Sequence, residues 1–163
     1  MPNANTFSIK PIREFISRHQ SGNTIDPFAN SSRIATVTND LNPEFNTDYN
    51  EDALTFLERF SDGRADTVLF DPPYSPRQVS EVYKALDKTV NMETTSSAFW
   101  SRCKNAVSFA VPANGVVLSF GWNSNGMGKK RGFEIIEVLI IAHGGMHNDT
   151  ICVAERRLPN LFD

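Results

Sequence analysis

Apolar residues occur along the chain either in short unbroken runs or at helical spacing, and the two patterns alternate. The β-branched or unbroken runs predict strands, which span residues 24–26, 34–38, 67–70 and 116–120. Segments with apolar residues three or four positions apart predict helices, which span residues 7–19, 53–60, 79–86 and 98–110. Strands that alternate with helices indicate an α/β fold with a parallel sheet.

The C-terminal part of the chain has a different pattern. Phe133–Ala142 and Thr150–Glu155 are both rich in β-forming residues, and only a short segment separates them. Two strands joined by so short a turn must be antiparallel, because a parallel return needs a longer crossover. The expected architecture is a mixed, mostly parallel sheet that ends in an antiparallel hairpin and carries helices on both faces.

Composition places the chain among ordinary globular proteins. It has 163 residues, 40% hydrophobic and 21% charged, which suits one domain with a core of its own. The formal net charge of -3 excludes a generally basic nucleic-acid coat. Cys103 and Cys152 are too few for a disulfide framework, so we expect reduced core residues in a cytoplasmic protein. Neither a membrane span nor a secretion signal is expected, because the chain lacks a long apolar run and a hydrophobic N-terminus.

Polar residues follow the predicted strands where each strand ends. Asp26, Asp40 and Asp71 stand at or just after three of them, and Gly121-Trp122-Asn123 follows the fourth. In open α/β sheets, ligands bind beyond the carboxyl ends of the strands. The sequence therefore predicts a site at that edge of the sheet.

The most specific segment is Asp71-Pro72-Pro73-Tyr74, directly after a buried strand. Two successive prolines lack N–H groups, so carbonyl groups near them are left as acceptors. A carboxylate, an available carbonyl and an aromatic ring together suit a planar group that bears an NH2. The two oxygens accept its N–H groups, and the ring stacks on its plane. The alternative interpretation is a strand-ending turn with an N-capping aspartate.

This segment resembles the catalytic motif of the DNA amino-methyltransferases, which methylate adenine N6 or cytosine N4 with S-adenosylmethionine. The aspartate at its first position is similar to the adenine-N6 members. The resemblance implies a Rossmann-like class I methyltransferase fold and a catalytic role for Asp71, Pro72, Pro73 and Tyr74. It extends from about Phe7 to Arg157, and small free-standing members of the family resemble proteins of phages and mobile elements.

A second segment resembles the family's cofactor loop. Asp26-Pro27-Phe28 stands where the family has an acidic residue and backbone amides that hold the methionine part of S-adenosylmethionine. Asn30 and Ser32 stand where the family usually has glycines. Asn30 is expected to make the turn because asparagine tolerates a left-handed backbone. The alternative is an ordinary strand-to-loop turn.

Two further acidic positions complete the implied cofactor site. Asp40, followed by Leu41, stands after the second strand, where a carboxylate accepts both hydroxyls of a ribose. Asp52, followed by Ala53, matches the family's acid that contacts the adenine amino group. A helix N-cap is the alternative role for Asp52, and the two roles are compatible. Phe70 and Pro72 are expected to supply apolar contact to the adenine ring.

Residues in loops after the strands are candidates for contact with the substrate. Trp122 and Asn123 follow the strand at 116–120, where core packing is the alternative for the indole. Positive charge in loops expected beyond the strand ends suits phosphates beside a flipped base, although a solvated loop also explains it. These basic residues are Arg77, Lys129, Lys130 and Arg131. His143, His147 and Asp149 in the hairpin turn suit a substrate-contacting edge, and no metal site is expected.

The resemblance implies a single methyltransferase domain over residues 1–163, in which residues 1–21 form a helical segment that flanks the cofactor site. The expected reaction is methyl transfer to adenine N6 in DNA. The alternatives are an RNA or protein N-methyltransferase and a non-catalytic binding subunit with the same fold. No gap in the chain is long enough for a separate target-recognition domain. We therefore expect a short target, or specificity lent by a second subunit or by a symmetric copy of this chain.

Overall fold

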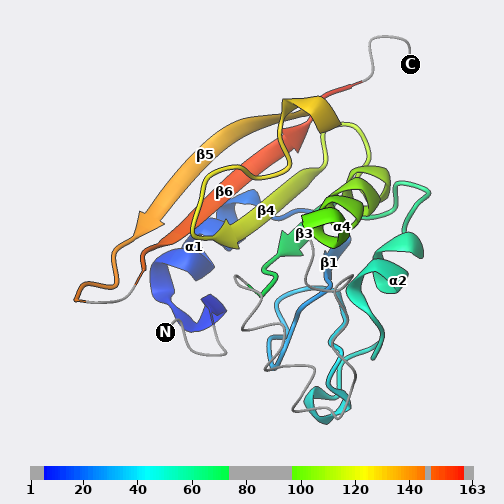
Figure 1. The fold of residues 1–163 in the computed structure, drawn as a ribbon, viewed down its shortest axis with the longest axis horizontal. Helices are drawn as coiled ribbons and strands as arrows, with labels where there is room; N and C mark the ends of the chain where they lie inside the picture. Colours follow the sequence, from blue (N-terminus) through cyan, green and yellow to red (C-terminus); the bar gives the residue numbers. More distant parts are fainter. Residues whose placement is uncertain (1–5, 74–96, 146–147, 160–163) are drawn as a thin grey trace.

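A computed structural model describes residues 6–73, 97–145 and 148–159 (Figure 1). The described residues form a six-stranded sheet with the strand order β2-β1-β3-β4-β6-β5. The strands are β1 (Thr24–Asp26), β2 (Val37–Thr38), β3 (Thr67–Phe70), β4 (Val116–Gly121), β5 (Phe133–Ile141) and β6 (Thr150–Arg157). The helices are α1 (Lys10–His19), α2 (Ala53–Glu58) and α4 (Ser97–Ala110), with short 3-10 helices η1 (Thr6–Ser8), η2 (Pro43–Phe45) and η3 (Lys129–Arg131).

The predicted mixed sheet is confirmed. Strands β2, β1, β3 and β4 are parallel, and β6 is antiparallel to both of its neighbours, β4 and β5. We call the edge where β1, β3 and β4 end the carboxyl edge, and the opposite one the amino edge. Because β6 lies between β4 and β5, β5 begins at the amino edge: its Phe133 pairs with Arg157, which lies beside the start of β4.

Two predicted elements differ from the structure. The strand expected at 34–38 is reduced to Val37–Thr38, the two residues that pair with β1. Ile34 and Ala35 instead contribute apolar packing to the core on the α1 side of the sheet. The helix expected from residue 7 begins at Lys10, after η1, with a proline in its first turn as predicted. The helix expected at 79–86 lies outside the described residues.

Helices α2 and α4 pack together on one face of the sheet. The apolar stripe predicted on α4 is confirmed, since Phe99, Cys103, Val107 and Ala110 are all buried. This core also contains β3 and β4 side chains, including Phe70 and Val117. The central strands bury side chains on both faces of the sheet. This is why β3 is an unbroken apolar run in the sequence. No helix among the described residues is long and apolar enough to cross a membrane.

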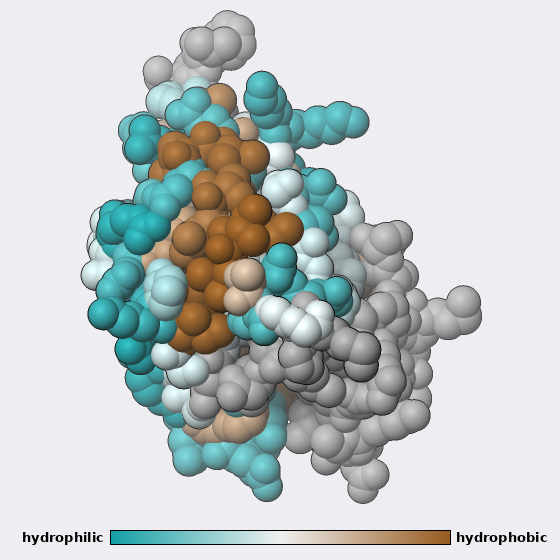
Figure 2. Space-filling model, turned by 90° about the vertical axis from the view of Figure 1, so that its left-hand side faces the viewer, coloured by the Kyte–Doolittle hydropathy of each residue, from teal (hydrophilic) through white to brown (hydrophobic). Residues whose placement is uncertain are grey.

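Strand β5 forms the outer edge of the sheet. Its residues Ile135, Val138 and Ile140 are 54%, 44% and 61% exposed. Figure 2 shows a continuous band of apolar side chains on the side of the molecule that contains β5.

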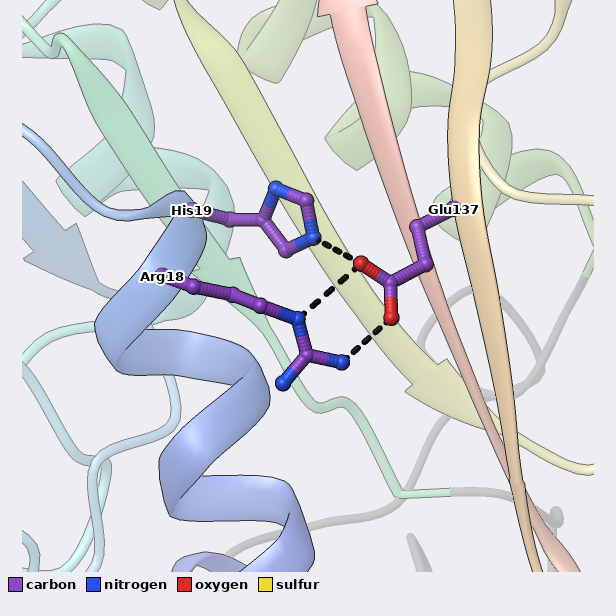
Figure 3. Close-up of polar contacts among 3 residues, drawn as sticks. All are labelled: Arg18, His19 and Glu137. Carbon is purple, nitrogen blue, oxygen red and sulfur yellow. Dashed lines mark hydrogen bonds and ion pairs between the residues drawn. The ribbon is translucent and has the colours of Figure 1, made fainter.

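Helix α1 covers the other face of the sheet. Ile12, Phe15 and Ile16 pack there against β4 and β6 side chains such as Phe120 and Cys152. The last turn of α1 is fastened to β5 by polar contacts, as Figure 3 shows. Arg18 donates two hydrogen bonds to the Glu137 carboxylate, and His19 Nε2 lies 2.6 Å from Glu137 Oε2. The N-terminal segment therefore packs as a helical layer on this face of the sheet.

Candidate active site

Three carboxylates meet at the carboxyl edge, as the strand pattern predicted. Asp26 ends β1, Asp40 lies two positions after β2, and Asp71 directly follows β3. The charges of Asp71 and Asp40 both act to raise the pKa of Asp26, so the three groups lie within electrostatic reach of one another. The parallel register of the strands brings them together, because parallel strands end at the same edge.

Asp26 is the most deeply placed of the three. Its side chain is fully buried, and its Oδ1 accepts a 2.9 Å hydrogen bond from the Phe28 backbone N–H. Its Oδ2 is buried and has no hydrogen-bond partner among the described residues. Burial raises the pKa of this carboxyl well above its ordinary value, opposed by the Phe28 hydrogen bond and reinforced by Asp71 and Asp40. A buried acceptor without a donor is costly, which indicates a place for a ligand that donates a hydrogen bond.

The loop after β1 is shaped by Asn30, which has a φ of 53°. The predicted left-handed turn at Asn30 is thus confirmed. The Asn30 side-chain oxygen accepts the Ser31 backbone N–H at 3.0 Å, and the Ser32 N–H donates to the Ala29 carbonyl at 2.8 Å. Ser32 is therefore accommodated within a hydrogen-bonded turn.

Asp40 ties this loop to the segment after β2. Its Oδ2 accepts the Asn30 N–H and its Oδ1 accepts the Asn42 N–H, both at 2.9 Å. Burial raises the pKa of Asp40, and these two hydrogen bonds oppose the shift. A carboxylate has about four acceptor positions, so two remain for the ribose role implied by the resemblance. Leu41, next to it, is half-buried.

Asn39 is a central residue of the site that sequence reasoning did not identify. It is fully buried, and its side-chain amide donates to the carbonyls of Pro27 and Glu51 at 3.1 Å. Its Oδ1 accepts the Glu51 N–H at 3.0 Å, and its backbone pairs with Asp26 and Ala29. One side chain thereby joins the loops after β1 and β2 to the segment before α2. In the sequence, this role is indicated only by the position of Asn39, at the end of a β-branched run and next to Asp40.

Arg33 makes a second connection that the sequence did not reveal. Its guanidinium donates to the backbone carbonyls of Asn30 and Ser32, within the loop after β1, and to that of Phe45 in η2. The exposed arginine thus holds two neighbouring loops together through their carbonyl groups.

Asp52 has the N-cap role predicted as its alternative. Its Oδ1 accepts the Leu54 N–H at 3.0 Å at the start of α2. Ala53 is buried beneath it. A contact with the adenine amino group stays a prediction.

Aromatic rings line one side of the loop after β1. Phe70 is only 2% exposed, so it lies beneath the half-buried ring of Phe28, with the ring centroids 5.6 Å apart. Phe28 also lies 6.1 Å from Trp100 of α4, which the sequence did not single out because it adjoins the apolar stripe. Phe28 and Trp100 are thus the more accessible apolar surfaces, and Phe70 supports them from the core.

The Asp71-Pro72-Pro73 segment begins at the carboxyl edge. Asp71, Pro72 and Pro73 are all half-buried and directly follow β3. Tyr74 and Arg77 lie outside the described residues, so their placement stays a prediction.

The carboxyl edge also includes the ends of β4 and β5. Trp122, 39% exposed, follows β4 directly, and Asn123 forms a turn by accepting the Asn125 N–H at 3.0 Å. The turn between β5 and β6 lies at the same edge, because Gly121 pairs with Ile151. There His143 Nε2 lies 2.7 Å from the Thr150 hydroxyl. Within the part of the chain that the structure describes, no three His, Cys, Asp or Glu side chains form a metal-binding group.

The expected place of the basic triplet was wrong. Lys129, Lys130 and Arg131 form η3 directly before β5, and β5 begins at the amino edge. The loop after β4 crosses back over the sheet: Glu155, on β6, accepts the N–H groups of Met127 and Gly128. A single copy of the chain therefore holds the triplet at the edge opposite Asp71, so it cannot lie beside a base bound there.

Comparisons with known proteins support the fold. No protein-family model matches the chain. No curated protein sequence matches it. Solved structures do match: TrmN from Thermus thermophilus, with 16% identity and a TM-score of 0.60, covers 96% of this chain. This chain spans about half of TrmN, 52% of its length.

Two other solved structures are similar. The N-methyltransferase NodS from Bradyrhizobium japonicum has 9% identity and a TM-score of 0.61, over 98% of this chain and 100% of NodS. SMU.776, determined in complex with SAH (S-adenosylhomocysteine), has 10% identity and a TM-score of 0.57, over 90% of this chain and 48% of its own. The chain therefore has the Rossmann-like fold of these methyltransferase structures, with the candidate site at the carboxyl edge.

Proposed function

We propose that this chain transfers a methyl group from S-adenosylmethionine to the exocyclic N6 of adenine in DNA. The observation that carries the proposal is the pairing of two acids at the carboxyl edge. Asp26 presents a buried oxygen that has no hydrogen-bond partner among the described residues, and Asp71, which begins the Asp-Pro-Pro-Tyr segment, lies within its electrostatic reach. One group suits a cofactor and the other an amino group that receives the methyl.

The residues around the loop after β1 fit the cofactor. Asp26 Oδ2 is an acceptor for the ammonium group of its methionine part, and Asp40 keeps acceptor positions for the ribose. Asp52, at the start of α2, is assigned the contact with the adenine amino group. Phe28 and Trp100 offer aromatic surface beside the loop. The SAH complex of the similarly folded SMU.776 supports this assignment. When bound, S-adenosylmethionine supplies an electrophilic methyl group on a positively charged sulfur.

Asp71 has the task of preparing the acceptor nitrogen. The lone pair of an adenine amino group is delocalised into the ring, so the nitrogen is a weak nucleophile. A hydrogen bond from that amino group to Asp71, and a second to a carbonyl near the prolines, favours a tetrahedral nitrogen with an available lone pair. Positioning and electrostatic stabilisation of this kind lower barriers by several kcal/mol. Tyr74 is assigned the stacking contact with the base.

Adenine in a duplex must leave the base stack to reach such a site, at a cost of a few kcal/mol. Arg77, Trp122 and Asn123 are assigned the contacts with the extruded nucleotide and its phosphates. The similarity to NodS, an N-methyltransferase, agrees with a nitrogen acceptor but does not distinguish DNA from other substrates.

The test is transfer of a labelled methyl group from S-adenosylmethionine to DNA, RNA and protein in parallel. We expect label in DNA that co-elutes with N6-methyladenine after digestion to nucleosides. Label in RNA or protein alone would contradict the DNA assignment while keeping the methyl-transfer chemistry. Saturable cofactor binding without transfer to any of the three would identify a non-catalytic subunit instead.

A further inference from the structure

The outer edge of β5 has the properties of a strand that pairs with another chain. β5 is nine residues long and pairs on one side with β6. Natural edge strands are usually protected by lysine, proline or a bulge. β5 contains neither lysine nor proline, and its one irregularity lies between Ile135 and Glu137. The stretch from Glu137 to Ile141 is regular and ends in exposed apolar side chains (Figure 2).

A second copy of the same chain fits this edge by shape and charge. Antiparallel pairing about a two-fold axis at Leu139 places Val138 of each copy opposite Ile140 of the other, so exposed apolar residues cover each other. It places Glu137 opposite Ile141, whereas an axis at Glu137 would set two glutamates face to face. Glu137 is in addition paired with Arg18 of its own chain, and its Oε2 lies 2.6 Å from His19 Nε2.

The same pairing changes which residues lie near the active site. The start of β5 in one copy then lies beside the end of β5 in the other. The η3 triplet of one copy therefore lies beside the partner's β5–β6 turn, which is at the carboxyl edge and carries the exposed Asp149. The positive charge of the triplet before β5 in one copy thus lies near the negative charge of Asp149 in the other. This complementarity favours antiparallel pairing of the two β5 strands over parallel pairing.

The separation between the active site of one copy and the triplet of the other suits a nucleic acid that contacts both copies. Four strand spacings separate β3 from the partner's β5, which is about 19 Å laterally. This corresponds to about five or six phosphates along one strand of DNA. A triplet at that distance contacts the backbone beside the target base rather than the base itself.

We infer that two copies pair through β5 and that each lends Lys129, Lys130 and Arg131 to the nucleic-acid-binding face of the other. The pairing stands on the geometry of β5 alone, whereas the lending of the triplet rests on the proposed function. Each part has its own experiment, so that the failure of one is distinguishable from the failure of the other.

The first experiment tests the pairing without using activity. Leu139→Cys places two thiols on the two-fold axis, at a spacing that allows a disulfide. We expect this variant to form a reducible covalent dimer under mild oxidation. Glu134→Cys is the matched control, since in this register the two Glu134 positions lie about ten residues apart, or ~33 Å. The native Cys103 and Cys152 are buried and do not interfere.

A charge on the edge provides the complementary test. Val138→Lys should convert a wild-type dimer to a monomer in sedimentation, with little change in thermal stability, because Val138 is 44% exposed. Phe109→Lys, at a residue 64% exposed on α4, should leave the dimer intact. A monomeric wild type, or a dimer that survives Val138→Lys, would overturn the pairing.

The second experiment tests the lending of the triplet. Asp71→Ala and the triple variant Lys129→Ala/Lys130→Ala/Arg131→Ala are co-expressed and assayed at a DNA concentration below half-saturation. Each variant alone should be at least tenfold less active than the wild type. The mixture should regain about a quarter of wild-type activity, because about half of the dimers are mixed and one of their two sites is complete.

The outcomes separate the two ideas. If the triplet acts within its own chain, no mixed dimer has a complete site and the mixture stays inactive. If the triple variant alone has wild-type activity, the triplet does not contact the substrate. If the wild type transfers no methyl group to nucleic acid, the proposed function fails, and with it the lending of the triplet, while the cross-link still decides the pairing.

Discussion

The backbone N–H of Asn30 donates a 2.9 Å hydrogen bond to Oδ2 of Asp40, ten positions further along the chain. This bond connects the turn after β1 to the acid after β2, so the loop after β1 is held by a carboxylate. The same carboxylate is assigned to the ribose. Asp40 therefore has two tasks, and substitutions at this position should separate them.

Asp40→Ala should weaken S-adenosylmethionine binding by about 10- to 100-fold, because charged hydrogen bonds contribute about 1.5–3 kcal/mol. Asp40→Asn keeps one oxygen acceptor and should lose less. Calorimetric titration measures both. Asn30→Gly is the matched control: it keeps the backbone N–H and suits the positive φ, so it should bind like the wild type. Unchanged affinity in Asp40→Ala would place the ribose elsewhere.

Asp26→Asn should stabilise the protein without cofactor and weaken cofactor binding. The folded-state pKa of Asp26 lies well above its ordinary value of 3.8, so the folded chain binds more protons than the unfolded one between these values. Stability from this group is thus present below pH 3.8 and is lost as the pH rises through the folded-state pKa. An asparagine does not ionise and avoids this loss.

The measurement for Asp26 is the melting temperature across pH. We expect the advantage of Asp26→Asn over the wild type to be about 2–4 °C at pH 8, roughly 1 kcal/mol, and smaller at pH 4.5. Asp62→Asn is a suitable control because Asp62 is an exposed acid paired with Arg64. If the advantage of Asp26→Asn does not depend on pH, burial does not raise the pKa of Asp26.

Asp71→Ala should abolish methyl transfer while cofactor affinity stays within about twofold of the wild type. The reason is that only the acceptor amino group is assigned to Asp71. Asp71→Asn should keep some activity, since its amide oxygen still accepts one hydrogen bond. Labelled-methyl transfer and calorimetry together check this, with Glu58→Ala, at an exposed residue of α2, as the control. Wild-type turnover by Asp71→Ala would refute the catalytic assignment.

The sequence predicted the acids of the site because their placement depends on strand ends alone. Once β1 and β3 are parallel neighbours, Asp26 and Asp71 must share an edge. The place of Lys129–Arg131 depends instead on where β6 inserts, and that pairing is non-local. A short turn establishes that β5 and β6 are antiparallel, but not which of them lies beside β4.

The connections made by Asn39 and Arg33 were not predictable for a similar reason. Their partners are mostly backbone carbonyls of other loops, such as those of Pro27, Glu51 and Phe45. Every residue type supplies such a carbonyl, so the partner sequence contains no signal. Only the folded path of the loops decides which carbonyl groups need a donor.

Glu137→Gln should loosen the attachment of α1 to β5. Hydrogen bonds from Arg18 and then His19 lower the pKa of Glu137 to about 2, from an ordinary 4.5. This contribution to stability is therefore present above pH 4.5 and is lost as the pH falls toward 2. Because the ion pair is partly exposed, we expect it to contribute no more than about 1 kcal/mol.

The check on Glu137 is acid unfolding followed by circular dichroism. The wild type should have its full advantage over Glu137→Gln above pH 4.5, keep only part of it at pH 3.5 and lose it near pH 2. Glu14→Gln, in the exposed pair with Lys10, should have no measurable effect. Loss of the advantage already at pH 5 would contradict the assigned ion pair.

Asn39→Ala should reduce both stability and cofactor affinity, although Asn39 is assigned no contact with the cofactor. The substitution leaves the Pro27 and Glu51 carbonyls and the Glu51 N–H without their buried partner, at a cost of about 2–4 kcal/mol. Asn39→Asp should not restore function, because a carboxylate cannot donate to the two carbonyls. Asn42→Ala is the matched control, since its side chain caps only the exposed η2.

The decisive comparison for Asn39 is made well below the melting temperature of every variant. If this residue sets the spacing of the loops that carry Asp26, Asp40 and Asp52, the dissociation constant of S-adenosylmethionine should rise at least tenfold in Asn39→Ala and Asn39→Asp. The rise should persist where circular dichroism shows both variants fully folded. A loss of stability with wild-type affinity would mean that bound cofactor orders these loops by itself, and that Asn39 serves the fold alone.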